Sequence, residues 1–165
     1  MKAKDFNTLP PTKLRFIEPL YARLVQKLPE GNEWLYEVKL DGYRCLAGRG
    51  KHQATLWSRR ENLFTKQFPR IAQVCEQLKP DTLLDGEIVA LDENGRPSFN
   101  LLQHHRSQAT AIHYYAFDLL IYRGKSLLTI PLEERRELLA EALGNIATAT
   151  VPFGCRKYSR VIRLI

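Results

Sequence analysis

The fold is decided by the stretch WLYEVKLDGYRCLA at residues 34–47. Its side chains alternate between apolar and polar until an Asp-Gly pair interrupts them at residues 41–42. Alternation with a period of two is typical of a half-buried strand, and Asp-Gly is typical of a tight turn between strands. We therefore predict an antiparallel hairpin made of strands 34–40 and 43–47.

The rest of the chain supplies further strands with helices inserted between them. We predict strands at 54–57, 82–91 and 112–122, and helices at 20–28, 64–78, 99–104 and 131–143. Consecutive strands separated by short turns favour antiparallel pairing, whereas strict alternation of strands and helices would favour a parallel sheet. The predicted fold class is α+β, with largely antiparallel sheets and flanking helices.

Composition limits the classes of protein. The chain has 165 residues, of which 44% are hydrophobic, so it suits one domain with a hydrophobic core. Its net charge of +7 suits a polyanionic partner such as a nucleotide or nucleic acid, although a merely soluble basic protein has the same balance. No apolar window approaches the roughly 18 residues of a membrane span. We expect a cytoplasmic protein with no membrane partner.

Cysteine and histidine carry no metal or disulfide signal. The three cysteines, Cys45, Cys75 and Cys155, are far apart and form no C-x-x-C pair. None of the four histidines has metal-ligand spacing with a cysteine. We expect free thiols in a reducing compartment.

Lys39 is the candidate nucleophile. In an extended chain it shares a face with Glu37 and lies just before the predicted turn, where its side chain can project into a cleft. A lysine attacks only as the neutral amine, and a nearby positive charge favours that form. Arg44 and a bound Mg²⁺ are the candidate charges. Taken alone, the pattern equally fits a solvated lysine on a surface hairpin.

Three segments carry polar residues on predicted strands: KLDGYR at 39–44, LDGEIVALD at 84–92 and YYAFDLL at 114–120. In this order they resemble the signature motifs of the covalent nucleotidyltransferases, which are the ATP-dependent DNA ligases, RNA ligases and mRNA capping guanylyltransferases. The resemblance implies the ligase and capping-enzyme nucleotidyltransferase fold, which is ATP-grasp-like. It also implies ATP and Mg²⁺ or Mn²⁺ as cofactors.

The resemblance assigns a role to each matching residue. Lys39 would attack the α-phosphorus of ATP and form a lysyl-AMP intermediate. Arg44 would contact the ribose, and Glu37 would lie by the base. Glu87 would contact the ribose and is a candidate metal ligand, and Phe117 would stack on the purine.

A fourth segment points to DNA. SRRENLFT at 58–65 resembles the ligase motif S-R-x-G-x-x-x-T, with Glu61 where the motif has glycine. Arg59 and Arg60 are therefore candidate contacts to DNA phosphates, although such a pair is also common on a solvated face. The implied DNA partner has a 5′-phosphorylated nick or end.

Residues 16–20, 97–102 and 130–136 resemble the bacterial end-joining DNA ligases. We divide the chain into an N-terminal arm with a short helix (1–30), a partial adenylation domain (31–145) and a basic, apolar tail (146–165). The tail matches neither the family's metal-binding glutamate strand nor its phosphate-binding lysines, and we expect the family's OB-fold domain to be absent from this chain. A missing partner chain is therefore one expectation. A catalytically impaired nucleotide- or DNA-binding fragment, and an RNA ligase or capping-type enzyme, are the alternatives.

Overall fold

The computed structural model describes residues 3–31, 34, 36–37, 39–105, 111–144, 146, 149–150 and 162–164. The helices in this part are α1 (Ala3–Thr8), α2 (Pro69–Cys75), α3 (Phe99–Gln103) and α4 (Leu132–Leu143). The strands are β1 (Tyr43–Arg49), β2 (Ala54–Ser58), β3 (Thr82–Ala90), β4 (Ile112–Tyr122), β5 (Lys125–Ser126), β6 (Ala149–Thr150) and β7 (Ile162–Leu164). The predicted α+β class is confirmed.

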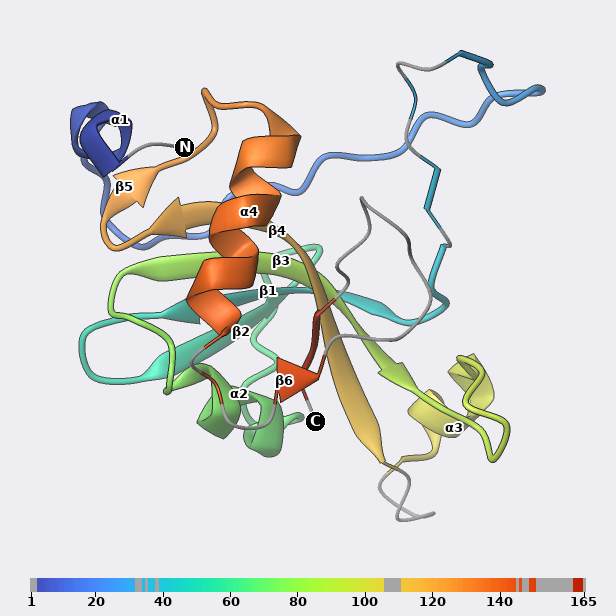
Figure 1. The fold of residues 1–165 in the computed structure, drawn as a ribbon. Helices are drawn as coiled ribbons and strands as arrows, with labels where there is room; N and C mark the ends of the chain where they lie inside the picture. The colour runs from blue at the N-terminus through green and yellow to red at the C-terminus, as the bar shows by residue number, and fades with distance from the viewer. Residues whose placement is uncertain are drawn as a thin grey trace.

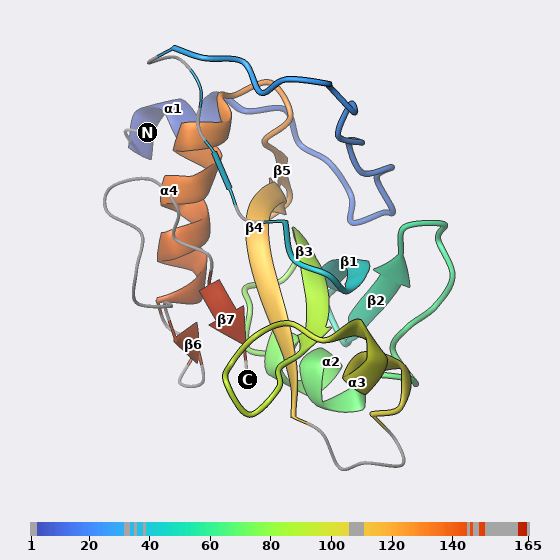
Figure 2. The same cartoon turned by 90° about the vertical axis from the view of Figure 1, so that its right-hand side faces the viewer.

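The strands form one antiparallel sheet in the order β2-β1-β3-β4-β7-β6, and β5 pairs with the end of β4 (Figures 1 and 2). The central strands β1, β3 and β4 each lie between two neighbours over part of their length. In the β1–β3 register Arg44 lies opposite Glu87, and in the β3–β4 register Glu87 lies opposite Tyr115. The three predicted motifs are thus side by side in the middle of the sheet.

Two hydrophobic clusters cover the two faces of the sheet. The larger joins alternate strand residues such as Cys45 and Ile88 to Ile71 of α2 and Leu139 of α4. In the smaller, residues of β1, β3 and β4 meet the N-terminal arm; it contains Leu46, Leu83, Leu120 and Ile121, with Leu14, Phe16, Ile17 and Trp57 packed against them. Cys45 and its neighbour Leu46 belong to different clusters because side chains alternate across a sheet. The helices therefore cover one face, and the arm covers part of the other.

The predicted strand at 34–40 is wrong for the residues that the structure describes there, which lie outside any strand. The reason is that β1 already has β2 along one edge and β3 along the other, so neither edge is open to a hairpin partner. Gly42 does not turn a hairpin. It lets the chain pass close over β3, where a Cβ would collide with the backbone oxygen of Ile88.

The predicted helix at 20–28 is also wrong, because the structure has no helix there. Leu20 is 85% exposed and Leu24 is 97% exposed, so these apolar residues have no core against which a helix could pack. A short helix that we did not predict, α1, precedes the arm instead.

The helix predicted at 64–78 is shorter than expected. α2 begins at Pro69, and Phe68 before it has φ −126° and ψ 62°, which is outside the helical region. The proline ring disfavours helical angles in the preceding residue, so the helix cannot extend backwards through Phe68. Phe68 and Leu78 remain buried in the larger cluster even though they lie outside the helix.

The other predicted elements are confirmed with small shifts at their ends. β4 has the predicted bounds, and α4 begins after Pro131 with Glu133 and Glu134 in its first turn. Negative charge there favours the positive end of the helix dipole. β7, from the predicted tail, extends the sheet by pairing with residues 114–116 of β4.

Two further expectations can be compared with the described residues. Cys45 and Cys75 are buried free thiols, as predicted, and Cys155 lies outside the described residues. None of the helices in the described part of the chain is long and apolar enough to cross a membrane.

Candidate functional site

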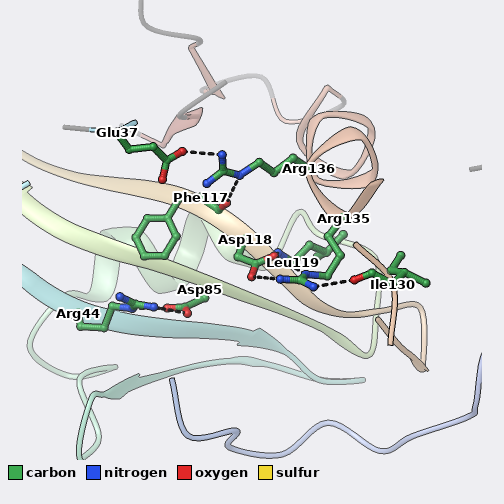
Figure 3. A network of polar contacts seen from close by, with 9 residues as sticks. All are labelled: Glu37, Arg44, Asp85, Phe117, Asp118, Leu119, Ile130, Arg135 and Arg136. Atoms are coloured by element: carbon green, nitrogen blue, oxygen red, sulfur yellow. Dashed lines mark hydrogen bonds and ion pairs between the residues drawn. The ribbon is translucent and has the colours of Figure 1, made fainter. Parts of the chain in front are cut away.

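Arg44 of β1 and Asp85 of β3 form a bidentate ion pair in the middle of the sheet (Figure 3). Nε and Nη2 of Arg44 donate to Oδ1 and Oδ2 of Asp85, each at 2.6 Å. Burial alone would lower the pKa of Arg44, yet the hydrogen bond and the charge of Asp85 raise it above its ordinary value. Two parallel charge-assisted bonds fix the plane of the guanidinium group. Arg44 is therefore a rigid, permanently charged part of the site.

Phe117 lies against that guanidinium group because of an irregularity in β4. Ala116 and Asp118 both pair with β3, but the register skips Phe117 between them. Such a bulge bends the strand and re-aims a side chain. The guanidinium carbon of Arg44 lies 4.5 Å from the centroid of the Phe117 ring, within the range of a cation–π contact. The residues predicted to contact ribose and base are thus neighbours.

Glu87 has the most perturbed carboxyl group of the predicted site. Burial raises its pKa from 4.5 to about 7; the positive charges of Arg44 and Lys39 oppose this rise, and Asp85 and Asp41 add to it. A carboxyl group with a pKa near 7 exchanges protons, or gives up its proton to bind a cation, in the physiological range. Lys39 is therefore close enough to Glu87 for its charge to affect the pKa of that carboxyl group.

Lys39 is exposed and lies outside any strand, three residues before Gly42, which packs against β3. Gly42 makes this possible, because a Cβ at that position would lie 3.0 Å from Cγ of Glu87 and 2.8 Å from Cγ1 of Val89. Contacts this close are sterically excluded for other residues. The glycine of the first motif therefore brings the candidate nucleophile to the carboxylate of the second motif.

Glu37 is held by a residue that the sequence analysis did not single out. Nη1 of Arg136, on α4, lies 2.5 Å from Oε1 of Glu37. Nε of the same arginine donates to the backbone oxygen of Phe117 at 3.1 Å. Figure 3 shows Phe117 between the Arg44–Asp85 pair and the Glu37–Arg136 pair. Glu37, Arg44 and Phe117 therefore belong to one connected group, and Glu87 lies opposite Arg44 in the sheet.

Asp118 and Arg135 complete this network and were also missed. Nε and Nη2 of Arg135 donate to the two carboxylate oxygens of Asp118, each at 2.8 Å. The hydrogen bond to Asp118 is the main cause that raises the pKa of Arg135. The signal was present in the sequence, since an aspartate inside the apolar strand 112–122 needs a buried partner of opposite charge. Which arginine supplies it depends on how α4 packs on β4.

Arg59 and Arg60 lie apart from this group, on the turn that follows β2. Both are exposed, and the guanidinium carbon of Arg59 lies 4.1 Å from the centroid of the Tyr21 ring. Glu61, where the ligase motif has glycine, has φ 62°. The turn therefore keeps the left-handed conformation that glycine adopts freely, at a cost of about 1–2 kcal/mol for another residue. Ser58 stabilises it by accepting hydrogen bonds from the backbone N–H groups of residues 60 and 62.

The described residues contain no group of three or more His, Cys, Asp or Glu side chains placed to hold a metal ion. The carboxylate of Asp85 is ion-paired with Arg44. The half-buried carboxylate of Glu87 is therefore the candidate ligand for a cation in this site. The role of Glu87 as a metal ligand stays a prediction.

The chain is similar to known ligases over most of its length. Residues 17–155 match the family model of the ATP dependent DNA ligase domain. The chain is 40% identical over 131 residues to the multifunctional non-homologous end joining protein LigD of Pseudomonas aeruginosa, a match that covers 78% of this chain and 15% of that protein.

Two solved structures resemble the fold. The ligase domain of Mycobacterium tuberculosis LigD is 37% identical with a TM-score of 0.63, and the match covers 74% of this chain and 40% of that one. A mycobacterial DNA ligase D complexed with ATP and MES is 35% identical with a TM-score of 0.57, over 67% of this chain and 36% of that one. The present chain thus spans well under half the length of each of these relatives.

Proposed function

This chain belongs to the ATP-dependent DNA ligase domain family, and from that membership we propose that it binds ATP and accepts AMP on Lys39. The observation that carries the proposal is the meeting of three sequence motifs at one place on the sheet. Arg44 lies opposite Glu87 and against Phe117. Lys39, brought in over β3, acts electrostatically on Glu87. A mycobacterial relative of known structure holds ATP.

In the proposed reaction the amine of Lys39 attacks the α-phosphorus of ATP. A phosphorus–nitrogen bond forms, the bond to the bridging oxygen of the β-phosphate breaks, and pyrophosphate leaves. The Lys39 ammonium loses one proton to form the neutral amine and its nitrogen loses a second as the phosphorus–nitrogen bond forms; both protons go to solvent, to which Lys39 is exposed. The reaction requires the neutral amine and a fixed alignment with the phosphorus atom.

The other residues bind and orient the nucleotide. The ring of Phe117, which is only partly buried, stacks on the purine in this proposal, and stacking on an aromatic side chain contributes about 1–3 kcal/mol per base. Arg44, whose plane is fixed by Asp85, contacts the ribose, and Glu37 lies by the base. We also propose Mg²⁺ or Mn²⁺, which would neutralise charge on the phosphates. Mg²⁺ on a nucleotide needs only one or two protein carboxylates, so Glu87 fits as its ligand.

We further propose that DNA receives the AMP. The adenylate would pass to a 5′-phosphate at a nick or end, and a 3′-hydroxyl would then displace AMP and seal the strand. Arg59 and Arg60 would contact phosphates near the join. The similarity to a non-homologous end joining protein supports a role in DNA repair, at the nucleoid in the bacterial cytoplasm. In this proposal further phosphate contacts come from outside the described residues, in this chain or in a partner chain.

The test is the formation of an AMP adduct. The purified chain is incubated with ATP and Mg²⁺ or Mn²⁺, and its intact mass is recorded beside Lys39→Ala and Lys79→Ala. Lys79 is exposed and lies between α2 and β3, away from the site, so its variant controls for the loss of any surface lysine. We expect one AMP on the parent and on Lys79→Ala, and none on Lys39→Ala.

A folded parent chain without an adduct would contradict the proposal that this chain transfers AMP by itself. The fixed Arg44–Asp85 pair beside Phe117 favours a second function in that case, which is nucleotide binding without transfer. Fluorescent ATP would then bind the parent and bind Phe117→Ala more weakly. An adduct on Lys39→Ala would instead show that another residue is the nucleophile.

A further inference from the structure

We propose that Arg136 is a positioning residue that fixes the segment carrying Glu37 and Lys39 against α4 and β4. This inference rests on the proposed function, since its consequence is the alignment of Lys39 for attack. It adds a residue outside the three motifs, on a helix that is remote from them in the sequence.

The first step in the argument is the geometry of Arg136. Its side chain is only 14% exposed, and it joins two acceptors from distant parts of the chain. Nη1 lies 2.5 Å from Oε1 of Glu37, and Nε donates to the backbone oxygen of Phe117 at 3.1 Å (Figure 3). The planar guanidinium group presents donors in fixed directions, so it can bridge two acceptors in a way that a lysine ammonium cannot.

The second step is that Arg136 is itself fixed. The preceding residue, Arg135, makes two hydrogen bonds to Asp118, and its Nη1 donates to the backbone oxygen of Ile130 at 2.8 Å. The side chains of Arg135 and Asp118 are 12% and 13% exposed, so this pair is well shielded from water. It prevents α4 from sliding along β4. The position of the Arg136 guanidinium group therefore follows from the packing of the helix.

The third step is that the nucleophile segment needs an anchor. The residues described between 34 and 40 lie outside strands and helices, so ladder hydrogen bonds do not hold them. Glu37 precedes Lys39 by two residues, and two residues of chain span at most about 7 Å. Fixing Glu37 beside Phe117 therefore restricts Lys39 to the neighbourhood of the proposed base-stacking ring. Gly42 restricts the same segment from the other side, at β3.

The experiment compares Arg136→Gln, Arg136→Lys, Glu37→Gln and the double variant Arg136→Gln with Glu37→Gln. Glu133→Gln, an exposed position in the first turn of α4, is the matched control. The first measurement is backbone ¹⁵N relaxation of the apoprotein, which gives the order parameters of Glu37, Lys39 and the β3 residues. The second is the single-turnover rate of AMP transfer as a function of ATP concentration.

For Arg136→Gln we expect the order parameters of Glu37 and Lys39 to fall from about 0.85 to below about 0.6, with those of β3 unchanged. The maximal rate of AMP transfer should fall by roughly a hundredfold, because misplacement by about 1 Å has that effect on an aligned reaction. The double variant should match Arg136→Gln, since that substitution already removes both the ion pair with Glu37 and the hydrogen bond to Phe117. Arg136→Lys should recover part of the rate, because it keeps the charge but not the bridge.

Equal order parameters at Lys39 in the parent and in folded Arg136→Gln would overturn the inference. So would a parallel fall of the order parameters in β3, because that would show a general loss of structure. Should Arg136→Gln fail to fold, Glu37→Gln removes the pair from its more exposed end and decides the question. A parent without an AMP adduct would refute the proposed function, while the relaxation measurement would still decide the role of Arg136.

Discussion

Glu87 should make the folded protein less stable as the pH rises from about 4.5 to about 7. Burial raises the pKa of Glu87 from 4.5 to about 7, so in this range the folded state keeps a proton that the unfolded chain releases. The free energy of unfolding then falls with rising pH. The difference between 7 and 4.5, at about 1.4 kcal/mol per pKa unit, sets an upper bound of about 3.5 kcal/mol. Because Glu87 is only half-buried, solvent screening reduces the effect to about 1–2 kcal/mol.

Glu87→Gln removes the titrating group but keeps the shape of the side chain. In urea unfolding between pH 5 and pH 8, the variant should gain about 1–2 kcal/mol relative to the parent as the pH rises. Glu93→Gln, at an exposed glutamate in the turn after β3, should follow the parent throughout. Lys39→Ala should move the transition to higher pH, because the charge of Lys39 lowers the pKa of Glu87. Parallel curves for the parent and Glu87→Gln would refute the reasoning.

Two other variants test the Arg44–Asp85 ion pair and the proposed contact of Arg59 and Arg60 with DNA. Asp85→Asn should lower the free energy of unfolding by about 2–4 kcal/mol in urea titrations, because it leaves the half-buried charge of Arg44 without its partner; unchanged stability would mean that the pair contributes nothing. Replacing both Arg59 and Arg60 with alanine should weaken binding to nicked duplex DNA and reduce the slope of log K against log salt by about 1–2, at about 0.9 per phosphate contact. Lys79→Ala should leave that slope unchanged, and an unchanged slope in the double variant would place the DNA elsewhere.

Much of the fold could be predicted because the signals are local. The apolar run at 112–122 defined β4 to the residue, since a long run of β-branched and aromatic residues has few alternatives. α4 followed from Pro131, the two acidic residues after it and Gly144. The same kind of local pattern failed at 34–40, where alternation indicated a strand but both edges of β1 were already occupied.

The chemistry of the site divides in the same way. Lys39, Arg44, Glu87 and Phe117 could be identified from motifs in which each residue type has its own chemical use. The contacts between these residues could not be predicted from the motifs. The bulge that turns Phe117 toward Arg44 depends on the register between two strands, and strand register is set by distant pairing.

The sequence by itself determined the family motifs, the candidate nucleophile and most of the sheet, because side-chain periodicity and turn residues act over a few neighbours. Only the tertiary structure decided that Gly42 packs over β3 instead of turning a hairpin, and that Arg136 of α4 holds Glu37. It also decided that burial brings the pKa of Glu87 to about 7. The physical reason is that steric contact, ion pairing and desolvation depend on distances between groups, and for residues far apart in the chain those distances exist only once the sheet and helices have packed.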